Sequence, residues 1–493
     1  MTRAAKCAEY VQNRRRHMPS IRLNAFSQLC FFSPEQLRDI HAGMLEILAE
    51  TGCELHHGQA LGLLRDAGAQ VSGKRVYLPA GMIEKALKGA PSRVMLYGRN
   101  GAPAMDLHGR NSYFGTGSDC IYLRDSFTGE RRLFTGPDQV NAVRLADALP
   151  NIDFIMSMGL ISGAEPALQY QLQYANMLKY SSKPQVIVAG DRKSLDDMTE
   201  LAAAVAPGGR EELKRKPRFL LYDEPISPLV HGFEAIDKLI YAAENRIPVN
   251  YSPGMMAGAT GPVTPAGAIT LAAAEIVFGL VIHQLAGPGA PFVFGAGMSN
   301  LDMGSMQPSY ASPEAMMTQA GVCELGRNLY HLPTWGFAGC CASKVADAQA
   351  INEAATYIFM AGLTGTNVNH DLGYLEFGLT YSFDLLVMAD ESVSQLRRIM
   401  DGIPVSREAQ ALDAIREVGP GGNFLDCDHT LDHYRDNWFP GVSDRNTFER
   451  WAELGSMTME RRCKAKIEKI LGEPAKARNA EKIDAALERI MRG

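Results

Sequence analysis

Aromatic side chains stand beside glycines in several short segments through the middle of this chain. They are Phe114, Tyr222, Tyr251, Phe294, Trp335, Phe337 and Tyr374, and His370 lies in the last of these segments. Rings that converge on one point attract a cation through the negative charge of their faces, and a quaternary ammonium suits such a cage because it donates no hydrogen bonds. Each ring taken singly is typical of core packing. Together with the space that glycines leave, the rings predict a site for a small cationic ligand.

The same segments lack the residues of two common kinds of catalytic site. No pair of segments supplies His-x-His ligands for a hydrolytic metal ion, and no lysine stands among them to form a Schiff base. The pattern therefore argues against a metal hydrolase and against a Schiff-base aldolase.

The ring-bearing segments belong to a regular alternation of strands and helices. Short apolar or aromatic runs lie at 112–115, 154–161, 185–190, 219–223, 248–252, 292–295, 334–336 and 366–369. Helical patterns follow them at 138–149, 168–179, 195–205, 233–245, 266–285, 313–329, 344–362 and 382–400. Eight such units close naturally, because each crossover is right-handed and a closed sheet has no edge. The sequence predicts an α/β fold, a (β/α)8 TIM barrel, with its site in the loops at the C-terminal ends of the strands.

A doubly wound open sheet is the alternative architecture. It would carry a phosphate-binding G-x-G-x-x-G motif near its first strand. Gly115, Gly117 and Asp119 do not complete that motif. A dinucleotide site is therefore not expected.

The predicted barrel covers residues 110–403 and is flanked on both sides. Residues 1–32 are expected to form a disordered tail, in which Met18 could equally be the true start. A helical cap is expected over 33–109 and a C-terminal helical extension over 404–493, with amphipathic helices at 457–471 and 479–491. These last helices hold more basic than acidic residues, which is typical of a solvated face and less often of a docking surface for an acidic partner.

Three serines indicate where helices begin. Ser33, Pro34 and Gln36 form a capping-box pattern at the start of the cap. Ser312 and Ser343 stand where two of the barrel helices are expected to begin.

Composition excludes several classes of protein. The chain has 493 residues, 46% of them hydrophobic and 21% charged, which is typical of a globular protein. Its 49 Lys and Arg against 55 Asp and Glu give a net charge of −6, which argues against a nucleic-acid partner. The apolar stretch 266–287 contains Glu275 and His283, so it predicts a buried helix and no membrane span. Nine irregularly spaced cysteines and no signal peptide predict a cytoplasmic protein, and homo-oligomers are the default for enzymes of this kind.

One cluster could bind a metal ion. Cys427, His429 and His433 form C-x-H-x3-H, which would need a fourth ligand from elsewhere to hold zinc. No second cluster of comparable spacing exists, so an ordinary polar loop is favoured and no bound metal is expected. The adjacent Cys340 and Cys341 are interpreted as small buried side chains.

Five segments carry a resemblance to a known family. They are 125–132 (DSFTGERR), 255–275 (MMAGATGPVTPAGAITLAAAE), 337–349 (FAGCCASKVADAQ), 370–378 (HDLGYLEFG) and 429–445 (HTLDHYRDNWFPGVSDR). The sequence resembles the trimethylamine methyltransferase family, in its branch without pyrrolysine, over most of residues 33–455. The resemblance implies a barrel, a methylated-amine substrate and a corrinoid-binding partner protein. Residues 336–343, where the trimethylamine enzymes carry pyrrolysine, are all standard here. The chain is therefore most similar to members that demethylate glycine betaine, or relatives of it such as proline betaine, carnitine and γ-butyrobetaine.

The implied reaction moves a methyl group to the Co(I) of that corrinoid protein. A quaternary amine already holds a good leaving group, a neutral tertiary amine, so no acid, base or tightly bound cofactor is required of this chain and positioning does most of the work. His370 is the candidate donor to the carboxylate of a betaine, or alternatively it holds the Asp371 loop. Asp223 or Glu224 could face the ammonium group or cap the helix that follows.

Two alternatives remain open. The donor could be carnitine-like or of the trimethylamine type. The protein could also be a non-catalytic quaternary-amine binding protein, which would seal its cage from solvent, whereas a corrinoid ring needs a wide opening.

Overall fold

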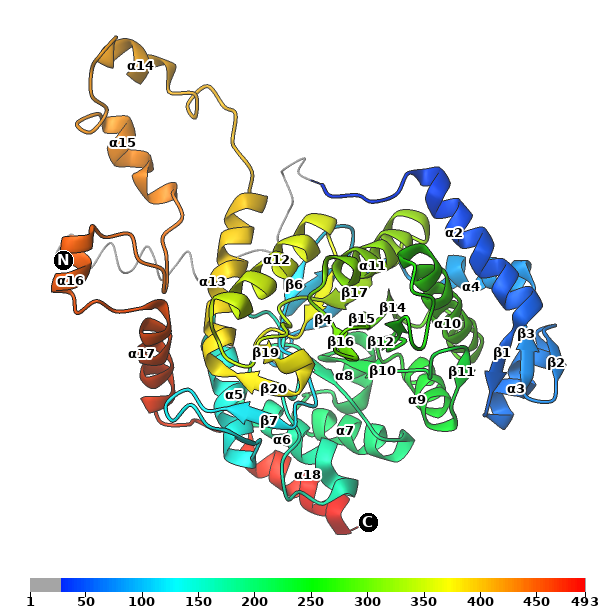
Figure 1. Cartoon of the computed structure of the whole chain (residues 1–493). Helices are drawn as coiled ribbons and strands as arrows, with labels where there is room; N and C mark the ends of the chain where they lie inside the picture. The colour runs from blue at the N-terminus through cyan, green and yellow to red at the C-terminus, as the bar shows by residue number, and fades with distance from the viewer. Residues whose placement is uncertain (1–27, 493) are drawn as a thin grey trace.

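The computed structural model describes residues 28–492 (Figure 1). The expectations for the two possible starts, Met1 and Met18, and for most of the N-terminal tail fall on residues 1–27 and so lie outside the described residues. The last part of the predicted tail is held in place. The backbone N–H of Leu29 donates to the carbonyl of Leu363, and that of Phe31 donates to the carboxylate of Glu324.

A curled sheet of parallel strands forms the centre of the molecule. Its seven strands are, in spatial order, β6 (Tyr113–Phe114), β18 (Val368–His370), β17 (Thr334–Phe337), β14 (Phe292–Gly295), β12 (Val249–Tyr251), β10 (Phe219–Asp223) and β9 (Gln185–Ile187). Each coincides with one of the predicted apolar runs. Strands that follow one another along the chain lie side by side, which is the arrangement of a TIM-like fold.

The sheet is not the closed eight-stranded barrel that the sequence predicted. The segment expected to be the remaining strand, 154–161, makes only single parallel bridges: Phe154 to Gly115 and Gly159 to Cys120 on the β6 side, and Ile155 to Gln185 of β9. Met158 has a left-handed backbone (φ 67°), and this interrupts the extended run between the bridges at Ile155 and Gly159. The gap between β6 and β9 is therefore spanned by three single bridges and not by a regular strand.

Eight long helices connect the strands and cover the outside of the sheet. They are α5 (Gly136–Ala148), α6 (Gln169–Tyr180), α7 (Arg192–Ala204), α9 (Phe233–Glu244), α10 (Pro265–Ala286), α11 (Pro313–Glu324), α12 (Ala348–Thr364) and α13 (Phe383–Met400), and a short α8 (Gly209–Arg215) follows α7. Within the described residues, α10 alone has the length and apolar composition of a membrane span, and most of it is buried inside the protein. It is a core helix, as predicted.

Two of the three predicted serine caps are confirmed. Ser33 and Gln36 form the reciprocal capping box, and the Ser312 side chain accepts from the backbone N–H of Ala315. The prediction for Ser343 was wrong. The helix begins at Ala348 because Asp347 caps it, and the Ser343 hydroxyl bonds to the Asp347 carboxylate instead.

The N-terminal region is mixed and not purely helical as expected. Its helices α2 (Pro34–Glu46), α3 (Gly58–Asp66) and α4 (Ala80–Gly89) lie beside α10 (Figure 1), and a π-helical turn, Ile47–Thr51, follows α2. It also contains the strands β1 (Cys53–Leu55), β2 (Gln70–Ser72), β3 (Arg75–Tyr77), β4 (Val94–Tyr97) and β5 (Pro103–Leu107). Strand β1 pairs with β11 (Val230–His231), which lies in the loop after β10.

The β4–β5 hairpin closes the core of the sheet from below. Leu96 and Met105 are fully buried and belong to one apolar cluster with Val186, Leu220 and Trp335 from the inside of the central sheet. Large apolar side chains therefore fill the interior under the C-terminal ends of the strands, which leaves space for a ligand only above them.

Loops at the C-terminal ends of the strands form two small accessory sheets. One consists of β7 (Tyr122–Arg124), β8 (Arg131–Leu133), β19 (Tyr374–Leu375) and β20 (Thr380–Ser382), and the other of β13 (Met256–Ala257), β15 (Ser299–Asp302) and β16 (Gln307–Ser309). They hold these loops in a definite position above the central sheet.

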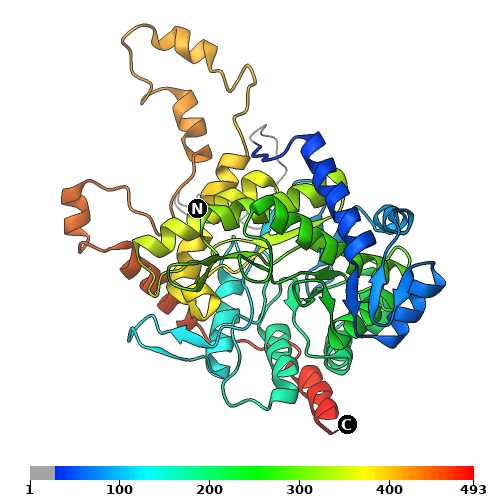
Figure 2. The ribbon, with the colours of Figure 1, turned by 45° about the vertical axis from the view of Figure 1, so that its right-hand side comes forward.

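The C-terminal region has a packed part and a projecting part. Helices α17 (Met459–Gly472) and α18 (Ala480–Arg492), both predicted, pack on α13 and α5 and on α6 and α7 respectively. Between α13 and α17 the chain carries the short helices α14 (Leu412–Val418), α15 (Asp428–His433) and α16 (Phe448–Glu453), and the segment with α14 and α15 extends away from the body in both views (Figures 1 and 2). We call residues 403–437 the arm. It returns to the body where the Glu391 carboxylate of α13 accepts from the backbone N–H groups of Gly441, Val442 and Ser443.

Candidate active site

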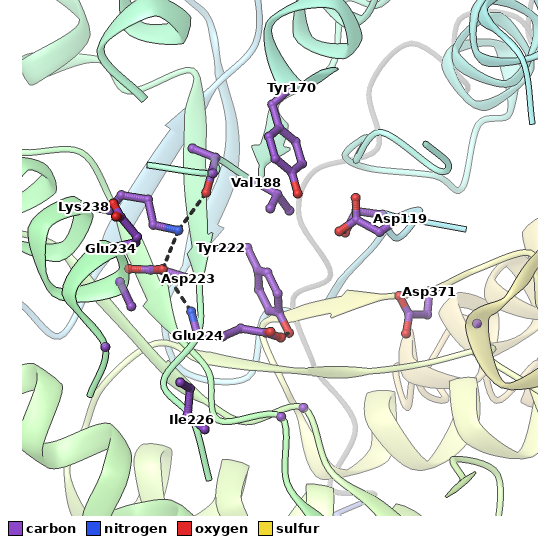
Figure 3. A pocket seen from close by; sticks show the side chains of 18 of the residues that line it. Asp119, Tyr170, Val188, Tyr222, Asp223, Glu224, Ile226, Glu234, Lys238 and Asp371 are labelled. Carbon is purple, nitrogen blue, oxygen red and sulfur yellow. Dashed lines mark hydrogen bonds and ion pairs between the residues drawn. The ribbon is translucent and has the colours of Figure 1, made fainter. Parts of the chain in front are cut away.

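A cavity of about 640 Å³ lies at the C-terminal ends of the strands (Figure 3). Its walls come from almost every strand-end loop of the central sheet, where the sequence predicted a site. The lining residues are Ser118, Asp119, Tyr170, Val188, Ala189, Gly190, Tyr222, Asp223, Glu224, Ile226, Gly232, Phe233, Glu234, Ala235, Lys238, Gly254, Gly297, Tyr310, Phe337, Asp371, Tyr374, Phe377 and Gly378.

Three of the eight predicted site residues reach this cavity. Tyr222 is the second-last residue of β10, Phe337 ends β17 and Tyr374 begins β19. Tyr310 from the loop before α11 adds a ring that meets Phe337 edge to face, with 5.4 Å between the ring centres. The predicted aromatic wall therefore exists, but with fewer of the predicted rings and one that was not predicted.

Trp335 and His370 lie directly under the cavity and do not line it. Trp335 is fully buried, and its ring centre is 5.3 Å from that of Tyr222 and 4.5 Å from that of His370. Phe337 also meets the His370 ring, at 4.5 Å. These two residues support the rings above them from the interior of the sheet.

The remaining three predicted residues face the helices. Phe294 packs on Tyr330, Tyr251 lies against His231 and Gly279, and Phe114 belongs to the large outer core. Side chains alternate between the two faces of a strand. The neighbours Val293 and Tyr113 occupy the inner cluster, so Phe294 and Phe114 must point outward. Tyr251 also points outward, because it lies against Gly279 of α10. The structure therefore does not place Phe114, Tyr251 or Phe294 at the cavity.

His370 is bound to its neighbour in the chain. Its Nδ1 lies 2.5 Å from Oδ1 of Asp371. This matches the alternative interpretation, in which His370 holds the Asp371 loop. The contact assigns the Nδ1 proton to the side facing the carboxylate, and the buried Nε2 has no hydrogen-bond partner.

Carboxylates are the main polar groups of the cavity. Asp119 and Asp371 lie opposite Tyr170 and Tyr222 around a common space (Figure 3), and Glu224 accepts a hydrogen bond from the Tyr222 hydroxyl. Both aspartates have left-handed backbones, with φ of 69° at Asp119 and 76° at Asp371. Such conformations are uncommon for residues other than glycine and cluster at functional sites.

Asp223 belongs to a buried ion pair. Its Oδ1 is 2.9 Å from Nζ of Lys238, and Lys238 also donates to the carbonyl of Ala189 at 2.7 Å. Neither Asp223 nor Glu224 caps the helix that follows, because the N-cap of α9 is Gly232. Both carboxylates face the cavity instead.

Enclosure by protein changes the protonation of these acids. Burial raises the pKa of Asp119 to about 6; the charge of Asp371 adds to this rise and the hydrogen bond from Ser118 opposes it. Burial also raises the pKa of Glu224, against the hydrogen bond from Tyr222. Water reaches Glu224 through the cavity although protein surrounds it on most sides. Because the pKa of Asp119 is about 6, its carboxyl is mainly ionised at neutral pH.

Close packing fixes the loops that carry these groups. The Tyr374 hydroxyl donates to the carbonyl of Ser118. A Cβ on Gly117 would lie 2.1 Å from Oδ1 of Asp371 and 2.5 Å from the Tyr374 ring. Only glycine at this position allows the strand-end loops after β6 and β18 to approach each other.

Sequence reasoning missed several lining residues. Tyr170 and Lys238 come from helices α6 and α9, outside the strand ends where the site was predicted. The prediction of a site without lysine did not anticipate Lys238, which reaches the cavity from a helix. The available signal was a lone charge on the apolar face of α9, beside Ala235 and Leu239, both of which are buried.

The C-x-H-x3-H cluster lies in the arm, at the start of α15 and within it. Cys427 precedes α15, the rings of His429 and His433 are 4.5 Å apart, and Nδ1 of His433 contacts Asp436. Within residues 28–492, no three His, Cys, Asp or Glu side chains are grouped so that they could hold a metal ion.

Comparison with known proteins places the chain in a family. The model of the trimethylamine methyltransferase family matches residues 1–492. The chain belongs to this family. It is 32% identical to the trimethylamine methyltransferase MttB of Desulfitobacterium hafniense strain DCB-2, over 94% of this chain and 93% of that protein. It is also 32% identical to a glycine betaine methyltransferase of Desulfitobacterium hafniense strain Y51, over 92% and 95% of the two chains. As a member of the family, the protein is a methyltransferase.

Solved structures support the fold. The monomethylamine methyltransferase MtmB of Methanosarcina barkeri matches with a TM-score of 0.50 and 13% identity, over 94% of this chain and 92% of that one. A hydroxylamine complex of MtmB matches with a TM-score of 0.51 and 12% identity over the same shares. At this level of identity the likeness concerns the fold alone.

Proposed function

We propose that this methyltransferase moves a methyl group from a quaternary amine to the Co(I) of a corrinoid protein. The observation that carries the proposal is the cavity at the strand ends, where aromatic rings and several carboxyl groups face the same space. Ring faces and carboxylates both attract a permanent positive charge. The names of the relatives, which act on trimethylamine or glycine betaine, support an amine donor.

The rim of the cavity is open, which favours a large methyl acceptor such as a corrinoid. Ile226 and Phe233 line the cavity and are 61% and 51% exposed. The cavity therefore opens at the surface through apolar side chains. A non-catalytic binding protein would be expected to seal its cage from solvent. The open rim argues against that alternative.

The reaction requires positioning and no proton transfer. One carbon–nitrogen bond of the amine breaks, and its electron pair stays on nitrogen, which leaves as a neutral tertiary amine. The methyl carbon bonds to cobalt, and the two electrons of that bond come from Co(I), which becomes methyl-Co(III). Binding the ammonium so that one methyl points out of the cavity, in line with the departing nitrogen, is the contribution of this chain.

Glycine betaine is the donor that the resemblance favours, because residues 336–343 are all standard. Carnitine-like donors and trimethylamine-type donors are the alternatives within the same reaction. We further infer a cytoplasmic homo-oligomer. Every cysteine among the described residues is free, which fits a reducing compartment.

The test is a methyl-transfer assay with purified protein and a reduced corrinoid protein. Glycine betaine, choline, carnitine and trimethylamine are added in turn, and the absorbance change from Co(I) to methyl-Co(III) is followed. We expect a change that depends on both the enzyme and a quaternary amine. No change with any quaternary amine would contradict the proposal.

A pair of variants makes the assay specific for the cavity. Tyr222→Leu removes a ring from its wall and should lower kcat/KM for the amine about fivefold to thirtyfold, since a cation–π contact contributes about 1–2 kcal/mol. Tyr434→Leu removes a partly exposed ring of the arm, away from the cavity, and should leave kcat/KM unchanged.

A further inference from the structure

Acidic side chains outnumber basic ones around the cavity. Five carboxylates line it, those of Asp119, Asp223, Glu224, Glu234 and Asp371. Lys238 is the one lysine or arginine among the lining residues that the structure describes. Its charge is matched by Asp223 at 2.9 Å, and a further hydrogen bond goes to the carbonyl of Ala189. No positive charge is left over for a ligand.

Two carboxylate oxygens in the cavity wall have no partner. Oδ1 of Asp119 and Oδ2 of Asp223 are buried and make no hydrogen bond. The Asp223 side chain is 1% exposed. Unpaired buried carboxylate oxygens are unfavourable unless a ligand of positive charge or a donor offsets them. They therefore point independently to a cationic ligand.

The cavity offers little to an anionic group. The Tyr222 hydroxyl donates to Glu224 and the Tyr374 hydroxyl donates to the carbonyl of Ser118. His370, the candidate donor from the sequence, is committed to Asp371 and does not line the cavity. The remaining phenolic donors, Tyr170 and Tyr310, are neutral, and a ligand carboxylate that reached them would stand beside several unpaired carboxylates.

We propose that the methyl donor is a cation without a carboxylate group, such as choline or another quaternary ammonium alcohol, and that the carboxylates of Asp119, Glu224 and Asp371 select it over zwitterionic betaines. This inference rests on the proposed function: it keeps the transfer from a quaternary amine but replaces glycine betaine, the donor that the resemblance favours, with a cation that has no carboxylate. The physical reason is that specificity depends on repulsion of the wrong ligand as much as on attraction of the right one. Choline and glycine betaine share the trimethylammonium group and differ only in the hydroxymethyl or carboxylate end.

The chemistry of transfer is the same for such a donor. In choline, one methyl–nitrogen bond breaks and its electron pair stays on nitrogen, so dimethylaminoethanol leaves. The methyl carbon bonds to cobalt, and Co(I) supplies both electrons of the new bond. No further reactant is needed.

The experiment measures binding and turnover separately. Isothermal titration of the purified protein with choline, tetramethylammonium and glycine betaine needs no corrinoid protein. We expect choline to bind at least tenfold more tightly than glycine betaine. Equal or tighter binding of glycine betaine, or no binding of either cation, would overturn the inference.

Turnover tests the proposed function independently. If glycine betaine binds more tightly and also transfers its methyl group, the charge inference fails and the methyltransferase proposal stands. If choline binds preferentially but no quaternary amine methylates Co(I), the proposed function fails while the selection of a cation holds.

Two variants assign the selection to named residues. Asp119→Asn and Glu224→Gln each remove one charge at constant size, and asparagine tolerates the left-handed backbone of position 119. Each should weaken choline binding about tenfold. Each should also lower the ratio of the affinity for choline to the affinity for glycine betaine. Glu50→Gln removes an exposed charge on the N-terminal region and is the matched control, with no expected change. An unchanged ratio in both cavity variants would show that these carboxylates do not select the ligand.

Discussion

Asp119 shows how one side chain can set the charge of the cavity. It follows Ser118 at the end of the β6 loop, where its backbone is left-handed and one of its oxygens has no partner. The groups that face it include Ser118, which donates a hydrogen bond, and the charged Asp371. The charge of Asp119 also interacts across the cavity with Tyr170 from α6 and with Glu224 from the end of β10.

We expect cation binding to depend on pH through Asp119. Burial raises its pKa to about 6. The carboxyl is charged above that pH and neutral below it, so the affinity for choline should fall roughly threefold to tenfold between pH 7.5 and pH 5. Glu224, whose pKa burial also raises, changes the affinity in the same direction. Titration calorimetry across this range measures the trend.

Asp119→Asn provides the comparison for this prediction. The variant should show a shallower dependence on pH, and Glu224 accounts for what remains. If the wild-type protein and the variant gave the same slope, Asp119 would not be the group that titrates.

At the scale of elements, the loop after β10 depends on a buried acid of α10. Glu275 accepts from the Ser227 hydroxyl at 2.8 Å and from the backbone N–H of Leu229 at 2.6 Å. The same loop carries Ile226 at the rim and β11, which pairs with β1. One side chain of the core helix thus links the rim of the cavity to the N-terminal region.

Glu275 should make stability depend on pH. Burial raises the pKa of its carboxyl from 4.5 to about 7, so the folded state binds this proton more tightly than the unfolded state does. The contribution is fully present below about pH 4.5 and is lost as the pH rises through about 7, by roughly 3 kcal/mol at most. Glu275→Gln keeps an acceptor and removes the charge.

Thermal midpoints at pH 5, 6, 7 and 8 measure this effect. The stability of the wild type relative to Glu275→Gln should decrease as the pH rises. A difference that stays constant across the series would be inconsistent with titration of Glu275.

At the scale of the whole molecule, the packed body and the arm differ in how they are held. Ile403 is 88% exposed and Leu425 is 78% exposed. In contrast, Cys463 of α17 and Ile483 of α18 are fully buried against the helices of the body. The chain therefore leaves the body after α13, returns at Glu391 and ends with two docked helices (Figure 2).

Limited trypsin digestion should cut the arm first. Arg407 and Arg416 are exposed on a segment with few contacts to the body, and such segments open most readily. The two fragments should remain together on a sizing column, because α17 and α18 stay packed on α5, α6, α7 and α13. Mass spectrometry identifies the cut sites. First cuts within the central sheet and its helices would contradict the predicted order.

Several features of this protein could be read from local pattern. Apolar runs such as 219–223 located the seven strands, and periodicity with caps such as Ser33 and Ser312 located the helices, because both depend on neighbours close in sequence. The position of the site at the strand ends and the family also followed from the chain alone. Alternation along β14 could have excluded Phe294 from the site, since Val293 faces inward.

The tertiary structure decided which groups meet in the cavity. Asp119, Tyr170, Lys238 and Asp371 are far apart in the chain and meet only because the sheet curls and α6 and α9 turn side chains over its upper edge. Local sequence pattern does not predict which of these side chains come together. Their contacts depend on the pairing of distant strands and on the single bridges near Phe154 that join the two edges of the sheet. The sequence alone therefore determined the family and most elements of the central sheet, and it predicted the place of the cavity and part of its aromatic wall. The negative charge of the site arose from packing.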